Sequence, residues 1–278
     1  MKTLILGATG LLGKALMREW TGDEVVGLGS RDVDIRDAAR AREVLQQTRP
    51  DWIVLAAAYT DVDGCESNAD LAFAVNRDGA LNVAEAAKVC GSKLLFVSSD
   101  YVFDGRKKSP YEAGDARNPQ SIYGRSKAEA EVRLLEVLPE VCIARTSWLF
   151  GTGGKCFPDT ILKLAASRPV LNVVDDQRGC PTYSVDLARA IMGLCRQNAQ
   201  GILHITNAGD CSWFEFAREI VKGAGLATEV QPVSSAQMAR PAPRPAYSVL
   251  SATSLHRYGI EAPVWMNALQ RYLKERGV

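Results

Sequence analysis

The sequence predicts an α/β protein in which a doubly wound parallel sheet carries helices on both faces and a smaller C-terminal lobe follows. Short, uninterrupted apolar segments alternate with segments of helical apolar spacing over roughly the first 150 residues, as is typical of a parallel sheet buried on both sides. A glycine-rich turn joins the first apolar segment to the first helix, and beyond residue 150 the alternation loosens. We therefore expect one domain at 1–150 and a lobe at 151–278, with chain segments able to cross between them.

The elements of the first domain follow from apolar content and spacing. The strands are short apolar runs, and the helices repeat apolar residues every three to four positions. The third helix is rich in alanine, and a turn-rich loop follows the fourth strand. In chain order we expect strand 3–6, helix 14–20, strand 24–28, helix 37–47, strand 52–55, helix 69–90, strand 93–98, helix 121–137 and strand 141–145.

The elements of the lobe are less regular. A glycine-rich loop at 151–154 opens it, Ser212 has the character of a helix N-cap, and a proline-rich stretch at 232–247 predicts an extended, ordered loop. These pieces are too irregular to pack alone, so we expect the lobe to fold against the first domain. In chain order we expect helix 157–168, strand 170–174, helix 184–197, strand 201–205, helix 212–224 and helix 263–276.

Composition narrows the classes of partner and compartment. Of the 278 residues, 47% are hydrophobic and 23% charged, and the formal net charge is +1, so nothing favours nucleic acid or an anionic membrane as partner. The seven cysteines are scattered and the two histidines lie far apart, which argues against disulfides and metal sites and suits a reducing cytosol. The first apolar stretch is too short for a signal peptide. We expect a soluble, cytoplasmic protein without a bound metal.

Three glycines after the first strand indicate a dinucleotide site. Gly7, Gly10 and Gly13 follow a strand and open a helix; such glycines let the backbone approach a diphosphate, which the N–H groups of the helix N-terminus then bind. The spacing GxxGxxG, in place of the more familiar GxGxxG, fits a Rossmann-like sheet. The cofactor contacts expected in this turn are Gly7, Thr9, Gly10, Leu11, Leu12 and Gly13.

The end of the second strand should select the cofactor. An acidic residue there binds the ribose of NAD, whereas a basic one accommodates the phosphate of NADP. Ser30 and Arg31 occupy this position and favour NADPH; alternatively, Arg31 is a solvated surface charge and NADH serves as well. Further cofactor contacts are expected from Asp34 and Ile35 near the adenine, and from Ala57, Ala58, Tyr59 and Val97 after or within the next two strands.

A Tyr/Lys pair predicts proton transfer beside this cofactor. Tyr123 and Lys127 stand four residues apart on an expected helix and therefore share one face of it. A nearby ammonium lowers the pKa of a phenol, whose unperturbed value is about 10. Ser99, at the end of the fourth strand, could polarise a substrate carbonyl. Because ligands of parallel sheets bind at the carboxyl ends of the strands, we expect the three to meet there, with Tyr123 and Lys127 also touching the cofactor.

The sequence resembles the dTDP-4-dehydrorhamnose reductase family of the extended short-chain dehydrogenase/reductase superfamily. The resemblance covers nearly the whole chain. It is carried by AAYTDVDGCE at 57–66, SSDYVFDG at 98–105, YGRSK at 123–127, RTSW at 145–148, DDQRGCPTY at 175–183 and the pair Arg244-Pro245.

The resemblance implies reduction of dTDP-4-dehydro-6-deoxy-L-mannose to dTDP-L-rhamnose with hydride from NAD(P)H. Tyr123 would donate the proton, Lys127 would lower its pKa and bind the nicotinamide ribose, and Ser99 would hydrogen-bond the ketone. Asp100 and Trp148 would touch the sugar, and Arg244 its phosphates. The substrate-binding set expected on these grounds is Val62, Ser99, Asp100, Phe103, Tyr123, Trp148 and Arg244.

The sequence departs from the family pattern at two places, and two alternative functions stay open. Ser99 stands where the family usually has threonine, which keeps the hydroxyl. Lys14-Ala15 stands where some members have an acidic ligand for Mg²⁺ at a dimer contact, so we expect a monomer or homodimer without bridging Mg²⁺. A 4,6-dehydratase is disfavoured because Tyr101 replaces its second carboxylate. The alternatives are a non-catalytic NADP-binding regulatory subunit, and another sugar-nucleotide ketoreductase or an epimerase.

Overall fold

A six-stranded, all-parallel sheet forms the centre of the molecule in the computed structural model, which describes residues 1–278. The strand order is β10-β5-β4-β3-β1-β2. The chain moves outward to β2 and then returns past β1 to β3, so the order reverses between β1 and β3. In such sheets ligands bind outside the carboxyl ends at this point. The strands are β1 (Lys2–Leu6), β2 (Glu24–Leu28), β3 (Trp52–Leu55), β4 (Lys93–Ser99), β5 (Cys142–Thr146) and β10 (Gly201–His204).

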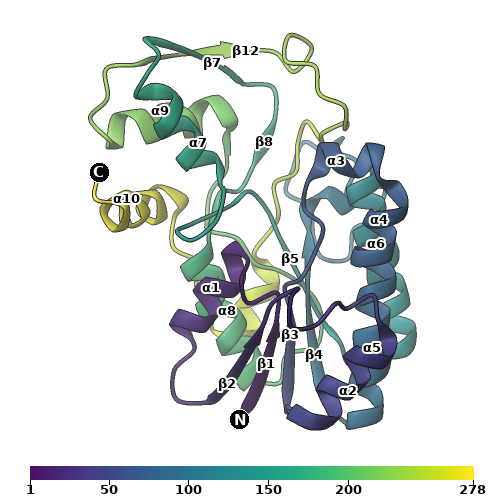
Figure 1. The fold of residues 1–278 in the computed structure, drawn as a ribbon. Helices are drawn as coiled ribbons and strands as arrows, with labels where there is room; N and C mark the ends of the chain where they lie inside the picture. The colour runs from purple at the N-terminus through teal and green to yellow at the C-terminus, as the bar shows by residue number, and fades with distance from the viewer.

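Helices cover both faces of this sheet (Figure 1). On one face α1 (Leu11–Glu19) packs on α8 (Ser184–Arg196). The other face is covered by α2 (Ala38–Thr48), α5 (Gly79–Cys90) and α6 (Ile122–Val137). The strands contribute fully buried side chains to both layers, as their continuous apolar sequence predicts. The expected α/β fold with a Rossmann-like parallel sheet is confirmed.

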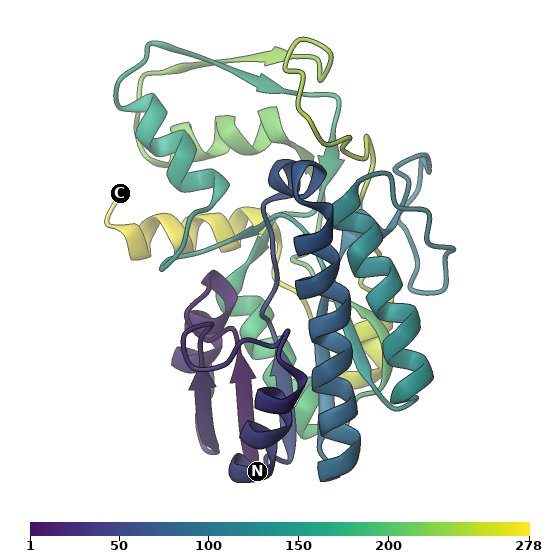
Figure 2. The same cartoon turned by 45° about the vertical axis from the view of Figure 1, so that its right-hand side comes forward.

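The lobe has a separate hydrophobic core and lies beyond the carboxyl ends of the strands (Figures 1 and 2). Its helices are α7 (Phe157–Ala165), α9 (Trp213–Gly223) and α10 (Trp265–Arg276). Its short strands pair as β7 (Val170–Val174) with β12 (Glu229–Val233), β8 (Arg178–Gly179) with β11 (Cys211–Ser212), and β6 (Leu149–Phe150) with β9 (Thr182–Tyr183). Because α8 and β10 belong to the central sheet and its cover, the chain crosses between the two cores; the division at residue 150 stays a prediction.

Three segments differ from their expected structure. The first helix begins at Leu11, three residues earlier than expected, directly after the glycine turn. The long helix expected at 69–90 is divided: α4 (Ala69–Phe73), a π-helical turn (Ala74–Asp78) and α5 follow one another, and α3 (Val62–Ser67) precedes them. The first two residues of the proline-rich segment belong to strand β12. The rest of the segment runs toward α3, where the Ala242 N–H donates to Asp63 (Figure 2). No helix of the structure combines the length and apolar character needed to cross a membrane.

Candidate active site

The glycine turn between β1 and α1 is packed so closely that side chains are excluded from it. Gly7 has φ +91°, and a Cβ there would lie 2.6 Å from the backbone nitrogen of Ala57. A Cβ on Gly13 would lie 2.1 Å from the carbonyl oxygen of Gly7. Gly10 is the N-cap of α1 and supplies no side-chain hydrogen bond, so the first N–H groups of the helix remain for a ligand. The turn therefore fits a dinucleotide diphosphate.

In the turn after β2, the Arg31 side chain is exposed to solvent, whereas the Asp32 carboxylate is hydrogen-bonded within the turn. The Asp32 carboxylate accepts a hydrogen bond from the Gly29 N–H at 2.8 Å, which holds it in the turn. Ser30 and Arg31 are exposed, and no carboxylate pairs with Arg31. This arrangement suits the extra phosphate of NADP better than the ribose hydroxyls of NAD.

The predicted adenine contacts have other partners in the structure. The Asp34 carboxylate pairs with Arg36, whose Nε donates to Oδ1 at 2.9 Å, and this hydrogen bond lowers the pKa of Asp34. The Ile35 side chain is buried in the core against Gly79. Only the backbone of Ile35 could therefore face an adenine, and both contacts stay predictions.

A buried asparagine that the sequence analysis missed fixes the turn after β3. Asn76 lies in the π-helical turn; its Oδ1 accepts from the Tyr59 N–H at 2.8 Å, and its Nδ2 donates to the Tyr59 carbonyl at 3.1 Å. Nδ2 also donates to the Ser126 hydroxyl at 3.0 Å, and that hydroxyl donates to the Tyr123 carbonyl at 2.8 Å. Asn76 thus links Tyr59, a predicted cofactor contact, to helix α6, which carries Tyr123 and Lys127. Asn76 is one of two asparagines in this alanine-rich segment, the other being Asn82, and such amides are the signal that could have revealed it.

Ser99, Tyr123 and Lys127 are brought together at the carboxyl end of β4. Ser99 is the last residue of β4, and Tyr123 lies in the first turn of α6. A Cβ on Gly124 would lie 2.2 Å from the Tyr101 carbonyl oxygen, so α6 begins in direct contact with the segment that follows β4. The buried Lys127 side chain donates from Nζ to the Val97 carbonyl at 2.6 Å.

The surroundings suit a tyrosine that donates a proton. Burial raises the pKa of Tyr123, and a hydrogen bond with Ser99 partly opposes this, so the phenol is protonated at neutral pH. Burial lowers the pKa of Lys127 to about 7, against the attraction of the Glu131 carboxylate. The lysine can therefore change charge near neutral pH.

Asp100 contacts Ser99 and keeps one oxygen free. The Ser99 hydroxyl donates to Asp100 Oδ1 at 2.9 Å, whereas Oδ2 is buried without a partner. Burial raises the pKa of Asp100 to about 6. An unpaired buried acceptor beside Ser99 is consistent with a ligand hydroxyl at this place.

The remaining predicted substrate contacts differ in their surroundings. Phe103 exposes 1% of its surface and stacks on Tyr111 with ring centroids 4.2 Å apart, so a substrate contact would require movement and stays a prediction. Val62 is half-buried at the start of α3. Trp148 has φ +45° and stacks on Trp213 at 3.5 Å with the rings 7° from parallel. The Trp148 side chain is thus half-buried on the lobe side of the site.

Arg244 forms an ion pair with Asp63 across the two cores. Its Nη1 and Nη2 donate to Asp63 Oδ1 and Oδ2 at 3.0 and 2.9 Å, and the Ala242 N–H donates to Oδ1 at 3.1 Å. The hydrogen bond from Arg244 lowers the pKa of Asp63. A substrate phosphate at Arg244 would have to share or displace this carboxylate.

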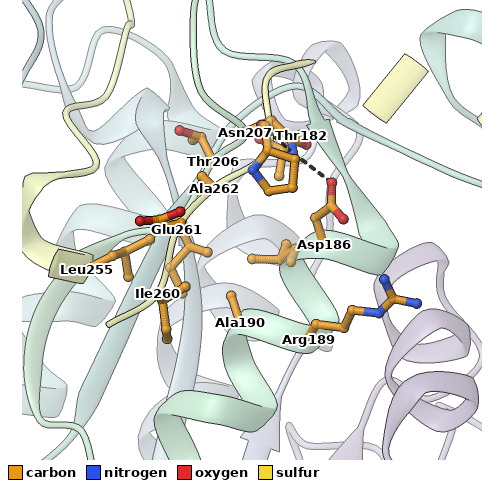
Figure 3. Close-up of a pocket in the computed structure, with 13 residues that line it drawn as sticks. Thr182, Asp186, Arg189, Ala190, Thr206, Asn207, Leu255, Ile260, Glu261 and Ala262 are labelled. Atoms are coloured by element: carbon orange, nitrogen blue, oxygen red, sulfur yellow. Dashed lines mark hydrogen bonds between the residues drawn. The ribbon is translucent and has the colours of Figure 1, made fainter. Parts of the chain in front are cut away.

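Two cavities lie near these elements. One of about 580 Å³ opens between α7, α9 and the proline-rich segment, and its lining includes Gln177, Trp213, Arg240 and Arg244. The other, of about 300 Å³, lies between α8, the end of β10 and residues 260–263 (Figure 3). In the second cavity Asp186 accepts a hydrogen bond from Asn207 at 2.7 Å, and Ser99, Tyr123 and Lys127 do not line it. Ser99, Tyr123 and Lys127 do not line the first cavity either; of the predicted substrate contacts, Arg244 alone lines it.

Known proteins match this chain over nearly its full length. A family model described as the RmlD substrate binding domain matches residues 1–277. The chain is 40% identical to the spore coat polysaccharide biosynthesis protein SpsK of Bacillus subtilis, over 99% of this chain and 98% of that protein. It is likewise 40% identical to a dTDP-4-dehydrorhamnose reductase of Mycobacterium tuberculosis, over 96% and 91% of the two chains.

A solved structure extends the comparison to the cofactor. The dTDP-4-dehydrorhamnose reductase of Bacillus anthracis in complex with NADP superposes with a TM-score of 0.96 at 38% identity, over 99% of both chains. With a family model that spans 277 of its 278 residues and relatives of this similarity, the chain belongs to the RmlD substrate-binding-domain family.

Proposed function

We propose that this chain is an NADPH-dependent reductase that converts dTDP-4-dehydro-6-deoxy-L-mannose to dTDP-L-rhamnose. The observation that carries the proposal is the meeting of Ser99, Tyr123 and Lys127 at the carboxyl end of β4, in a chain whose whole length belongs to a family with reductases of this name. NADPH, when bound, supplies the hydride.

The residues of the chain would perform the proton transfer. Tyr123 gives its phenolic proton to the ketone oxygen as the hydride adds to the carbonyl carbon. Ser99 holds that oxygen through its hydroxyl, and Lys127 in its charged form eases the loss of the proton. Gly7, Gly10 and the N-terminus of α1 hold the diphosphate of the cofactor, and Arg31 its extra phosphate.

The nucleotide sugar would occupy the 580 Å³ cavity and extend from it towards Asp100 and Trp148. Arg240 and Arg244 line this cavity and offer two cations to a diphosphate, while Asp100 and Trp148 would border the sugar. Binding of the diphosphate would draw Arg244 away from Asp63, with which it pairs at 2.9 Å. Two observations support Arg244 as a phosphate contact: it lines the cavity, and its pairing with Asp63 links the proline-rich segment to α3.

We also infer a reducing compartment and a chain that functions as a monomer or homodimer without bridging Mg²⁺. All seven cysteines are free, which suits the cytoplasm. Lys14 stands where the family resemblance would place an acidic Mg²⁺ ligand, and its Nζ donates to the Gly153 carbonyl at 2.6 Å.

The test is a turnover assay with the purified chain. Loss of NADPH absorbance should depend on dTDP-4-dehydro-6-deoxy-L-mannose, and chromatography and NMR of the product should identify dTDP-L-rhamnose. A product with the opposite configuration at C4 would favour another ketoreductase. Fluorescence that reports bound NADPH together with no turnover would contradict the proposal and favour a regulatory subunit.

A further inference from the structure

A fully buried acid lies one helical turn beyond Lys127. Glu131 exposes 0% of its surface, and four hydrogen bonds reach its carboxylate. Oε1 accepts from the Ser98 hydroxyl at 2.6 Å and from Arg145 Nε at 2.9 Å. Oε2 accepts from Arg145 Nη2 at 2.6 Å and from Arg117 Nη1 at 3.1 Å. The carboxylate thus faces two guanidinium groups and joins α6 to β4, to β5 and to the loop before α6.

Lys127 has no direct contact with this acid but lies within its field. The two residues are four positions apart on α6 and both are buried, so they share one face of the helix. Lys127 Nζ donates to the uncharged Val97 carbonyl and lies 4.0 Å from the centre of the Phe96 ring. Neither partner supplies a negative charge, and Glu131 is the acid that supports the charged form of Lys127.

Only one of the cations around Glu131 can give up its proton near neutral pH. Arg117 and Arg145 stay charged at every pH at which the protein is folded, because guanidinium does not deprotonate in proteins. Without the Glu131 charge, two guanidiniums and one ammonium would remain in a buried cluster. Lys127 would relieve that repulsion by becoming neutral.

We propose that the buried carboxylate of Glu131 holds a larger share of Lys127 in its charged form near neutral pH and thereby sets the readiness of Tyr123 to release its proton. Glu131 touches neither substrate nor cofactor in this account, so it is a positioning residue. The proposal rests on the proposed reductase function for its catalytic consequence, whereas the charge of Lys127 can be measured without turnover.

The other titratable groups around the cluster have defined states. His204 of β10 lies 3.4 Å from Arg145 Nη1; burial, with a contribution from Arg145, lowers the pKa of His204 to about 4, so it is neutral. Burial raises the pKa of Asp100 to about 6, and Glu131 is not among the groups that shift it. A difference between the wild type and a Glu131 variant therefore reports on Lys127.

The first experiment compares the pH dependence of kcat in the wild type and in Glu131→Gln. A lower pKa of Lys127 means that its charged form is lost at lower pH. The limb along which activity falls with rising pH should therefore move by about one to two pH units toward acid, the size expected for a charge removed one helical turn away in a protein interior. Activity lost at neutral pH should return on acidification, which a purely structural defect would not produce.

Control variants separate charge from packing. Glu129→Gln is matched, because Glu129 lies on the same helix and pairs with Arg77 at 2.9 Å, but at the surface; its limb should stay at the wild-type position. Glu131→Asp keeps the charge in a shorter side chain and should also keep the limb. The double variant Glu131→Gln/Arg145→Gln removes both charges of the buried pair, so its limb should move back toward the wild type, and it should fold if the single variant does not.

A measurement that needs no turnover tests directly whether Glu131 supports the charged form of Lys127. NMR of protein with isotope-labelled lysine follows each side-chain titration in the absence of cofactor, and Lys127→Met identifies the signal. Lys127 should titrate at lower pH in Glu131→Gln than in the wild type. Equal titration in both proteins would overturn the inference, even if the reductase assay succeeds; a shifted titration in a chain without reductase activity would keep it and contradict the proposed function alone.

Discussion

Gly13→Ala sets local helix propensity against the packing of the cofactor turn. In an open helix, alanine is more stable than glycine by about 1 kcal/mol. At Gly13 the added Cβ would lie 2.1 Å from the Gly7 carbonyl oxygen and 2.6 Å from the Ala8 Cα. All these neighbours are backbone atoms, so no side chain can rotate away. To reach 3.0 Å from that oxygen, the start of α1 and the turn must separate by about 0.9 Å, that is 3.0 minus 2.1.

The expected magnitude follows from this separation. Overpacking of a close contact costs about 1–3 kcal/mol, which in a protein of this size lowers Tm by about 2–6 °C. The same shift moves the N–H groups of α1 away from the cofactor diphosphate. Loss of one charge-assisted hydrogen bond, worth about 1.5–3 kcal/mol, should weaken NADPH binding by at least about tenfold.

Thermal unfolding and NADPH titration by fluorescence measure both effects. Gly193→Ala is the matched control: Gly193 lies inside α8, and a Cβ there would meet only Ile260 Cδ1, at an ordinary 3.7 Å. This variant should be as stable as the wild type or more stable by up to about 1 kcal/mol, with unchanged NADPH binding. If Gly13→Ala matched Gly193→Ala in both measurements, the proposed packing of the turn would be refuted.

Three further variants test other parts of the site. Tyr123→Phe should leave NADPH affinity nearly unchanged and lower kcat by about 10²-fold or more; retained activity would mean that another group donates the proton. Arg31→Ala should weaken NADPH more than NADH in paired titrations, and equal weakening would show that Arg31 does not meet the phosphate. Asp63→Ala removes the ion pair of Arg244, so limited proteolysis should cut residues 234–246 faster while Tm changes little; an unchanged cleavage rate would show that the pair does not hold this segment.

The sequence predicted the central sheet because its signals are local. Each strand is an uninterrupted apolar run, and burial on both faces of a parallel sheet demands such a run. The glycine turn was predictable as well. A Cβ on Gly13 would meet the backbone of the same turn, and a Cβ on Gly7 would meet the backbone that follows the neighbouring strand β3. The π-helical turn at 74–78 was not predictable, because an alanine-rich segment favours a continuous helix and the cause of the irregularity, the hydrogen bonds of Asn76 to Tyr59 and Ser126, is long-range.

In the candidate site, too, long-range contacts could not be predicted from the sequence. Ser99, Tyr123 and Lys127 could be placed from strand order and helix periodicity. The partners of Arg244 and Trp148 could not, because Asp63 lies 181 residues from Arg244 and Trp213 lies on a helix that follows two crossings between the cores. A motif can indicate that an arginine is important, but not which carboxylate holds it before a ligand arrives.

Glu131 illustrates why burial changes the meaning of a helical pattern. On the sequence, Lys127 and Glu131 form an i, i+4 pair of opposite charges, which on an exposed helix would be a surface ion pair worth about 0.5 kcal/mol or less. In the fold both side chains face the sheet, and Arg145 and Arg117 take every oxygen of the acid. The pair therefore cannot act as a salt bridge. Glu131 therefore acts on Lys127 only through its electrostatic field. The low dielectric of the protein interior makes the effect of that single charge larger than it would be at the surface.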